Sequence, residues 1–271
     1  MTGDGVNDAP ALKAADVGTA MGITGTEVAK SASDMILTDD KFDTIVHAVE
    51  EGRRVYENIK KTVYFLLSCN ISEIFIMLIA VIMGWGLPVI AIQLLFVNVV
   101  ADGIPGFALS REKADPTIMD KRPTAKGESI FANGGYRNIA IAAITFTVTT
   151  LIGFYVGSFI EVEASLVASH AVGQTMAFLI LGFSSVLHIF NARTKESIFK
   201  AGVTSNRSLF FLAMLSIALI ALVATVPFLA AIFDLVALSA THWFMVIGLS
   251  LAIIVVVEVQ KFILNKMNRA F

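Results

Sequence analysis

Residues 62–110, TVYFLLSCNISEIFIMLIAVIMGWGLPVIAIQLLFVNVVADGIPGFALS, decide the fold, because they contain no Lys or Arg and only two acidic side chains. A helix that spans a bilayer needs ~20 consecutive apolar residues, so this stretch has room for two spans and a short connection. Residues 84–87 in its middle carry two Gly, which suit a tight turn. The stretch therefore predicts two neighbouring transmembrane helices.

Two further stretches of about 50 residues lack Lys and Arg, one between Arg137 and Arg193 and one between Arg207 and Lys261. The whole chain of 271 residues is 56% hydrophobic and 15% charged, with a mean hydropathy of +0.77. Soluble domains carry about 25% charged residues, so a single water-soluble globule is excluded. We predict a mainly α, polytopic bundle of six transmembrane helices in contact with a lipid bilayer. The predicted spans are 62–83, 88–109, 138–160, 169–190, 209–232 and 243–263.

The net charge of −2 says little until the charges are placed along the chain. All 20 Lys and Arg fall in four blocks, at 13–61, 111–137, 193–207 and 261–269. The connections at 84–87, 161–168 and 233–242 carry none of them. The positive-inside rule then places both termini in the cytoplasm and the three short connections outside, and we expect the cell membrane as the location. Nothing in this pattern indicates a nucleic-acid partner.

The acidic segment 1–61 differs from the rest and reads as a small α/β piece. Strands are expected at 17–21 and 34–37, and helices at 26–31 and 42–61, the last running on into the first span. This βαβα order is typical of part of a doubly wound sheet. About 60 residues is small for an independent core, so we predict an incomplete α/β segment. It opens directly on a turn motif, with no strand expected before it.

That motif is residues 2–10, TGDGVNDAP. Asp4 and Asp8, four residues apart on a Gly-flanked turn, suit a hard divalent cation such as Mg²⁺. The Gly residues let the backbone approach a phosphate, to which Asn7 can donate a hydrogen bond. Asp-Gly and Asn-Asp are also ordinary turn signals, so an ordinary turn stays open as the alternative.

The two acidic side chains in the first hairpin, Glu73 and Asp102, indicate a cation site. An ionised carboxylate near the bilayer centre costs a few kcal/mol and is a functional-site hypothesis by default. Asn70 lies on the same helix face as Glu73, and Asn98 on the same face as Asp102. Three residues that can interrupt the helix follow, namely Gly103, Pro105 and Gly106. The four oxygen-bearing side chains suit a cation such as Ca²⁺, and the alternative is a hydrogen-bonded cluster that only holds helices together.

Residues 2–10 resemble the hinge motif of the P-type cation-transporting ATPases, and the chain is most similar to their type II, calcium-pump branch. The resemblance continues through GTAMG (18–22), GTEVAKSA (25–32), DMILTDD (34–40), VEEGRRVY (49–56), NISE (70–73), NVVADG (98–103) and IMDKRP (118–123). It is strong to about residue 123 and weaker through the last four spans. It implies that segment 1–61 is part of a haloacid-dehalogenase-like phosphorylation (P) domain.

The resemblance also implies roles for the hinge residues. Asp4 would bind the catalytic Mg²⁺, Asn7 would contact the phosphoryl group, and Asp8 would help hold the motif and the metal. The cofactor-binding loop would consist of Thr2, Gly3, Asp4 and Gly5. ATP would be bound by a nucleotide domain upstream of Met1.

In the membrane, the resemblance implies four ligands for the transported cation, namely Asn70, Glu73, Asn98 and Asp102. Two positions depart from pumps of the sarcoplasmic-reticulum kind. Ala101 stands where they have Thr, and Ser185 stands where their later ligand Glu falls. We therefore expect one transported ion per cycle. His188, one turn on from Ser185, is either a packing residue or a replacement polar group.

The phosphorylated motif of the family, Asp-Lys-Thr-Gly-Thr, does not occur in these residues. The chain thus resembles the C-terminal third of a pump, and we expect it to be inactive towards ATP without the N-terminal part. The expected parts are 1–55 (P-domain piece), 56–110 (ion-binding hairpin), 111–137 (cytoplasmic loop) and 138–271 (four further helices). The leading hypothesis is a fragment of an ATP-driven pump for Ca²⁺. The alternatives are a pump for H⁺, Na⁺, K⁺ or Mg²⁺, or a non-catalytic cation-binding membrane protein.

Overall fold

The computed structural model describes the whole chain except residues 126, 133, 162–167, 195 and 269–271. The chain divides into two compact units. The smaller unit consists of Met1–Tyr56 and Ala114–Pro123, and the larger unit of Glu57–Lys113 and Thr124–Phe271.

The smaller unit contains a three-stranded parallel sheet in the order β1-β2-β3. Its elements are β1 (Thr2–Gly3), η1 (Val6–Asp8), α1 (Ala9–Ala14), β2 (Thr19–Met21), α2 (Glu27–Ala32) and β3 (Met35–Leu37). The two strands expected from the sequence are confirmed, and so is the helix between them. The expectation that no strand precedes the turn motif is wrong, because Thr2 and Gly3 pair with Thr19 and Ala20. A two-residue strand is too short to show an alternating pattern.

Six helices of the described chain are long and apolar enough to cross a membrane, which confirms the predicted fold class. They are α3 (Phe42–Ile82), the combined α4 (Ala91–Phe96), η2 (Val97–Gly103) and α5 (Ile104–Leu109), then α6 (Gly135–Phe159), α7 (His170–Ala192), α9 (Arg207–Thr225) and α11 (Ala240–Asn268). The helix expected at 42–61 does run on into the first span, as one element of 41 residues. A short helix, α8 (Ile198–Ala201), lies between α7 and α9.

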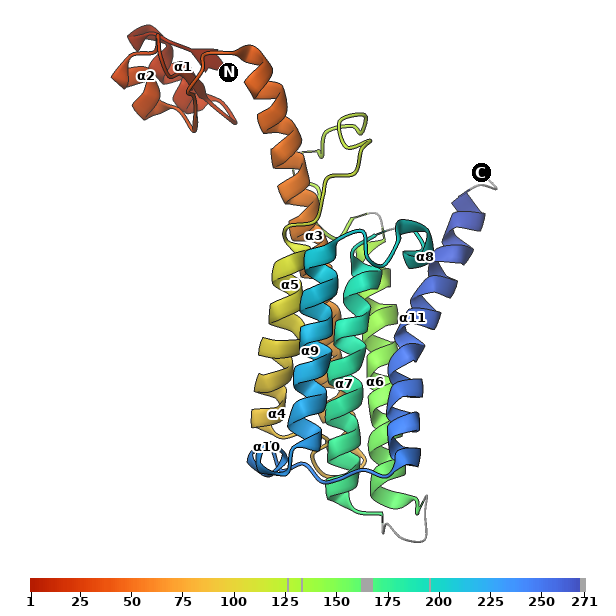
Figure 1. Ribbon diagram of the computed structural model, residues 1–271. Helices are drawn as coiled ribbons and strands as arrows, with labels where there is room; N and C mark the ends of the chain where they lie inside the picture. The colour runs from red at the N-terminus through yellow and green to blue at the C-terminus, as the bar shows by residue number, and fades with distance from the viewer. Residues whose placement is uncertain (126, 133, 162–167, 195, 269–271) are drawn as a thin grey trace. The chain divides into compact units, whose positions relative to one another are not determined.

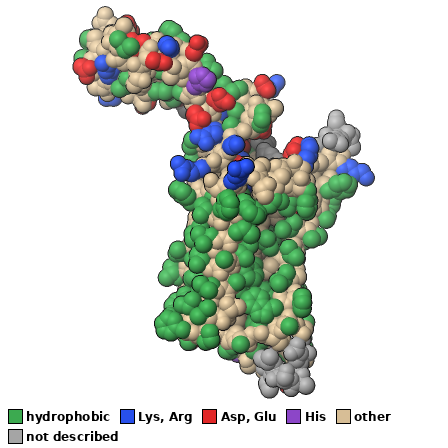
Figure 2. Space-filling view, in the orientation of Figure 1, with side chains coloured by type: hydrophobic (Ala, Val, Ile, Leu, Met, Phe, Trp, Pro, Cys, Tyr) green, Lys and Arg blue, Asp and Glu red, His purple; other side chains and the backbone are tan. Residues whose placement is uncertain are grey.

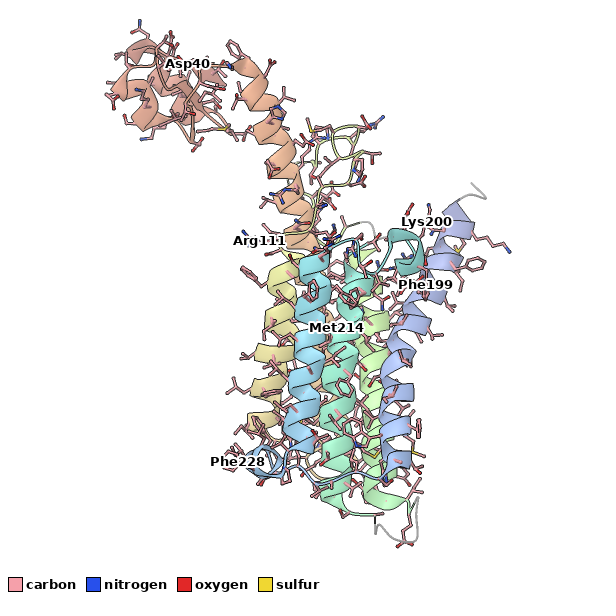
Figure 3. All side chains as sticks on the ribbon, viewed as in Figure 1. Asp40, Arg111, Phe199, Lys200, Met214 and Phe228 are labelled. Atoms are coloured by element: carbon pink, nitrogen blue, oxygen red, sulfur yellow. The ribbon has the colours of Figure 1, made fainter. Side chains whose placement is uncertain are left out.

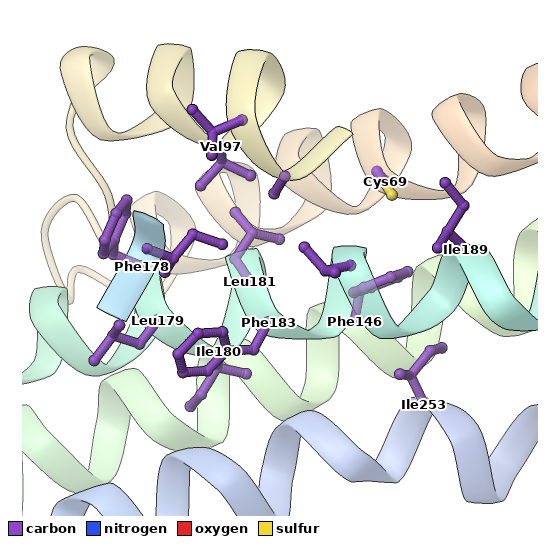
Figure 4. Close-up of a cluster of buried hydrophobic side chains, with 14 of the residues drawn as sticks. Cys69, Val97, Phe146, Phe178, Leu179, Ile180, Leu181, Phe183, Ile189 and Ile253 are labelled. Atoms are coloured by element: carbon purple, nitrogen blue, oxygen red, sulfur yellow. The ribbon is translucent and has the colours of Figure 1, made fainter. Parts of the chain in front are cut away.

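The helix α7 forms the centre of the bundle and is buried along almost its whole length (Figure 1). It contacts α6, α9, α11 and η2. Figure 4 shows the core that results, with Cys69 of α3, Val97 of η2 and Phe146 of α6 meeting side chains of α7 such as Leu181. The residues of η2 therefore contact both α7 and α9.

The outer surface of the bundle matches a membrane protein. Hydrophobic side chains cover the middle of the face seen in Figure 2, and Lys and Arg gather towards one end. Arg111, just beyond the end of α5 and labelled in Figure 3, lies at this end, which we call the basic end of the bundle. Arg193 follows the last residue of α7, and Arg207 is the first residue of α9.

The first connection is a tight turn between α3 and α4. Gly84 and Gly86 have φ angles of +69° and +88°, a region that favours glycine. The second helix begins at Ala91, three residues later than expected. Its first turn is capped by Gln93, whose Oε1 accepts a hydrogen bond from the backbone N of Ile90 at 3.1 Å. The turn makes α3 and α4 consecutive helices of one hairpin.

The fifth span is shorter than the predicted 209–232. The helix α9 ends at Thr225, and a separate short helix, α10 (Pro227–Ile232), follows; its Phe228 is labelled in Figure 3. Proline lacks an N–H and disfavours helical geometry in the residue before it, and Val226 is indeed extended, with φ −85° and ψ 115°. Most of the predicted connection 161–168 lies outside the described residues.

Candidate functional site

The second membrane helix changes its hydrogen-bond pattern where two of the four predicted ligands lie. Residues Val97–Gly103 form a π-helical segment, η2, in which the backbone N–H of Ile104 donates to the carbonyl of Val99, five residues back. Such π turns are rare and occur frequently at functional sites. This π-helical segment contains both Asn98 and Asp102. It begins before Gly103, Pro105 and Gly106, the residues from which the sequence predicted an interruption of the helix.

Asp102 is a buried carboxylate with no partner among the described residues. Its exposed fraction is 1%, and neither oxygen accepts a hydrogen bond. Its neighbours are the Ser185 hydroxyl and the Cys69 thiol, and Glu73 lies within electrostatic range. A buried carboxylate is stable only when it is paired, protonated or bound to a cation. Asp102 therefore has the environment expected of a cation ligand.

Glu73 and Asn98 are brought together directly across the hairpin. The Asn98 Nδ2 donates to both carboxylate oxygens of Glu73, at 3.3 and 3.1 Å, and to the carbonyl of Leu94 at 3.0 Å. Both side chains are half-buried. Because the Asn98 nitrogen is engaged, its amide oxygen is the atom that could bind a cation.

Asn70 lies one turn before Glu73 on α3. Its Nδ2 donates to the carbonyl of Leu66 at 2.8 Å, so again the amide oxygen is the possible ligand atom. Among the residues that the structure describes, no group of three or more His, Cys, Asp or Glu could hold a metal. A cation here would therefore need amide or backbone oxygens besides the two carboxylates.

The residues at which the sequence departs from the calcium-pump pattern lie close by. Ser185 of α7 is fully buried beside Asp102, and its hydroxyl donates to the Cys69 thiol at 3.4 Å. His188, also fully buried, packs against the rings of Tyr64, Phe65 and Phe146, with centroids 5.3–6.1 Å apart. Neither of its ring nitrogens has a hydrogen-bond partner in the described part of the chain. Of Ser185 and His188, Ser185 is therefore the residue that lies beside a candidate ligand, Asp102.

The hinge motif forms a compact loop at the carboxyl end of β1. The Asp8 Oδ2 accepts hydrogen bonds from the backbone N–H groups of Asp4, at 3.1 Å, and Gly5, at 3.0 Å. A side chain at Gly3 would place its Cβ 2.6 Å from the Asp8 Cβ, so only glycine allows this approach. The side chains of Asp4 and Asn7 are exposed.

The backbone of the loop is fixed from a second element. The Asp4 carbonyl accepts hydrogen bonds from Thr26, at 2.8 Å from its backbone N and 3.2 Å from its hydroxyl. Ligands of open α/β sheets bind at the carboxyl ends of the strands, where Asp4 lies. The loop therefore presents an exposed carboxylate and an exposed amide at that edge, while Asp8 accepts hydrogen bonds from the loop backbone.

A second buried carboxylate, Glu112, was not expected from the sequence. Its Oε1 lies 3.0 Å from the Arg193 Nε, and its Oε2 accepts a hydrogen bond from Asn206 at 2.8 Å. Asn58 of α3 donates to its backbone carbonyl at 2.8 Å. We call these four residues the basic-end network. Because its members are far apart in sequence, only the folded bundle shows the pairing.

Comparison with known proteins shows the family of the chain. Residues 86–263 match the family model described as "Cation transporting ATPase, C-terminus". The chain belongs to the cation-transporting ATPases. Because the match begins within the first hairpin, it includes the second membrane helix and its π-helical segment.

Individual relatives extend the match to nearly the whole chain. The chain is 42% identical over 274 residues to "Calcium-transporting ATPase 1" of Bacillus cereus. The aligned region covers 96% of this chain and 30% of that protein. It is 40% identical over 250 residues to "Calcium-transporting ATPase" of Bacillus subtilis, covering 92% and 28%. The human "Calcium-transporting ATPase type 2C member 1" is 36% identical over 262 residues, covering 96% and 28%. The chain thus spans less than a third of the length of these relatives.

Proposed function

We propose that this chain supplies the membrane cation site and part of the phosphorylation domain of an ATP-driven Ca²⁺ pump. The observation that carries the proposal is the buried Asp102 on a π turn, which has no hydrogen-bond partner among the described residues, with Glu73 and Asn98 nearby. The names of the relatives support Ca²⁺ as the transported ion. The ligands are Asn70, Glu73, Asn98 and Asp102.

Their chemistry fits a hard cation. Ca²⁺ takes 6–8 oxygen ligands in flexible geometry. Two carboxylates and two side-chain amides supply part of this set, and the π turn can expose backbone carbonyls to supply more. One membrane site with Ser185 in place of a carboxylate favours one ion per cycle.

The hinge loop fits a Mg²⁺-dependent phosphoryl-transfer site. Asp4 would hold Mg²⁺, Asn7 would contact the phosphoryl oxygens, and Asp8 keeps the loop closed through its hydrogen bonds. The loop residues Thr2, Gly3 and Gly5 would line the phosphate side. The bound metal supplies positive charge for the phosphoryl oxygens. ATP and the phosphorylated aspartate would come from the N-terminal part of the pump.

The proposed division of the chain follows from these roles. Residues 1–55 belong to the phosphorylation domain, 56–110 form the ion-binding hairpin, 111–137 connect it, and 138–271 complete the bundle. In this arrangement both termini lie in the cytoplasm and the protein resides in the cell membrane. The partners are the lipid bilayer, the cation and the N-terminal part of the pump.

The test uses a chimera in which this chain replaces the matching segment of the Bacillus subtilis relative. Phosphorylation by radiolabelled ATP is measured with Ca²⁺, Mn²⁺, Na⁺ or K⁺ at a series of concentrations. We expect phosphoenzyme formation to depend on Ca²⁺ and to be lost in Asp4→Asn. No response to Ca²⁺ in a chimera that responds to another ion would show that the ion assignment is wrong.

Direct binding separates the pump from the non-catalytic alternative. The 271-residue chain is reconstituted in lipid nanodiscs, and ⁴⁵Ca²⁺ binding is measured at equilibrium. Binding by the chain together with a chimera that is never phosphorylated would favour a cation-binding membrane protein without pump activity.

A further inference from the structure

The carbonyl of Val100, inside the π-helical segment, has lost its usual backbone donor. In an α-helix it would accept from Ile104, but the N–H of Ile104 donates to Val99 instead. In a continuing π pattern it would accept from residue 105, which is Pro105 and has no N–H. Neither helical pattern can therefore satisfy this carbonyl.

Ser216, in the middle of α9, supplies the donor. Its hydroxyl lies 2.7 Å from the Val100 carbonyl oxygen, in a bond between residues 116 positions apart, and its side chain is fully buried. Met214, two residues earlier on α9, is labelled in Figure 3. A buried carbonyl left without a donor costs free energy, so this bond favours the π turn over a regular helix.

We propose that Ser216 is a positioning residue for the cation site, because its hydrogen bond holds the π turn that orients Asp102. The extra residue in a π turn rotates the residues after it by about 100° relative to an unbroken α-helix. If the turn relaxed, Asp102 would change its direction relative to Asn98 and Glu73. This inference rests on the cation site proposed above, although Ser216 itself is not a ligand.

A double-mutant cycle tests the inference in the full chain in nanodiscs. In Ser216→Ala we expect ⁴⁵Ca²⁺ affinity to fall about tenfold, the effect of leaving one buried carbonyl unsatisfied. Pro105→Ala restores an N–H at residue 105, which can donate to Val100. In that background the same serine replacement should cost less than about threefold.

Ser250→Ala is the matched control. Ser250 is also a buried serine in a membrane helix, but its hydroxyl donates at 2.7 Å to Val246 within its own helix. We expect its affinity for Ca²⁺ to stay within twofold of wild type. Ser216→Thr, which keeps a hydroxyl, should recover at least half of the lost affinity on a logarithmic scale.

Hydrogen–deuterium exchange separates failure of this inference from failure of the proposed function. Without any ion, peptides covering residues 97–109 should exchange faster in Ser216→Ala than in Ser250→Ala. If wild type bound no Ca²⁺ but this difference remained, the proposed function would fail and the bracing of the π turn would stand. Equal exchange and equal affinity in Ser216→Ala and wild type would overturn the inference, as would equal losses in the two alanine variants.

Discussion

Asp102 and Glu112 are buried carboxylates near the middle and just beyond the end of the same membrane helix, yet their surroundings are opposite. Glu112, 7% exposed, is bound by Arg193 and Asn206. Asp102, 1% exposed, accepts no hydrogen bond from any described residue. Burial alone therefore does not distinguish a structural carboxylate from an ion-binding one. The partners differ in charge: the Arg193 guanidinium balances the carboxylate of Glu112, whereas no cationic side chain among the described residues pairs with Asp102.

In the basic-end network, each of the three guanidinium nitrogens of Arg193 also has a partner. Besides Glu112, the Arg193 guanidinium donates to the Gly202 carbonyl and the Ser205 hydroxyl. Together with the Asn206–Glu112 bond, these contacts join the end of α7 to the start of α9 and to the segment after α5. Arg111, which lies next to Glu112 in that segment, is labelled in Figure 3. The network therefore holds the helix ends together, and its carboxylate has a structural role.

The largest expected effect is that of Asp102→Asn. We expect ⁴⁵Ca²⁺ binding to weaken by more than about 100-fold, as when one member of a buried charge pair is lost. Thermal stability without ion should hold or rise, because an unpaired buried charge is removed. In the comparison variant Glu112→Gln, affinity should stay within threefold while the melting temperature falls. Unchanged binding in Asp102→Asn would contradict its assignment as a ligand.

The next largest effect is on stability, in Arg193→Met. Removing this cation leaves Glu112 buried and unpaired, at a cost of about 3–5 kcal/mol in the free energy of unfolding. Thermal and denaturant unfolding in nanodiscs measure this cost. The double variant Arg193→Met with Glu112→Gln should recover part of it, since no charge is then left unpaired. A single variant as stable as wild type would show that the network is not structural.

A smaller effect is expected in Glu73→Gln. Glu73 is half-buried and already bound by Asn98, so solvent screens its attraction for a cation. We expect Ca²⁺ affinity to fall about tenfold, less than in Asp102→Asn. Glu258→Gln is the control, because Glu258 is paired with Lys261 at 3.4 Å. A larger loss of Ca²⁺ affinity in Glu73→Gln than in Asp102→Asn would contradict the expectation that the more deeply buried carboxylate binds the cation more strongly.

The smallest effect concerns Asp40 of the smaller unit, a carboxylate satisfied by backbone N–H groups. Hydrogen bonds from Ile23 first, and also from Thr24 and Gly22, lower the pKa of Asp40 to about 2. Because this value lies below the unfolded pKa of about 3.9, its stabilising contribution is present above pH ~4 and is lost as the pH falls towards ~2.

Exchange of the amides of residues 19–24, corrected for intrinsic rates, reports this contribution. Asp40→Asn, which tolerates the positive φ of +53° at this position, should remove the extra loss of protection in that pH window. Asp43→Asn, at an exposed position at the start of α3, should leave it unchanged. The same pH response in wild type and Asp40→Asn would exclude the carboxylate as its origin.

The membrane helices could be predicted well because their signal is local. The Lys- and Arg-free stretches indicate six spans, and Gly84 and Gly86 mark a turn that the structure confirms through their positive φ. The end of the fifth helix could have been predicted too, since Pro227 prevents its continuation, but the apolar run beyond it concealed the break. Strand β1 could not, because two residues carry no periodicity and become a strand only by pairing with β2.

The sequence by itself determined that there are six long apolar segments, and that Glu73 and Asp102 are the acidic residues of the first two. It also determined the position of the hinge loop, through the spacing of Gly3, Asp4, Gly5 and Asp8. Only the tertiary structure decided which buried polar groups are satisfied. Glu112 pairs with Arg193 and the Val100 carbonyl accepts from Ser216, whereas Asp102 has no hydrogen-bond partner among the described residues. Hydrogen bonds and ion pairs depend on atoms within about 3 Å, and residues 81 or 116 positions apart reach that distance only when the helices pack.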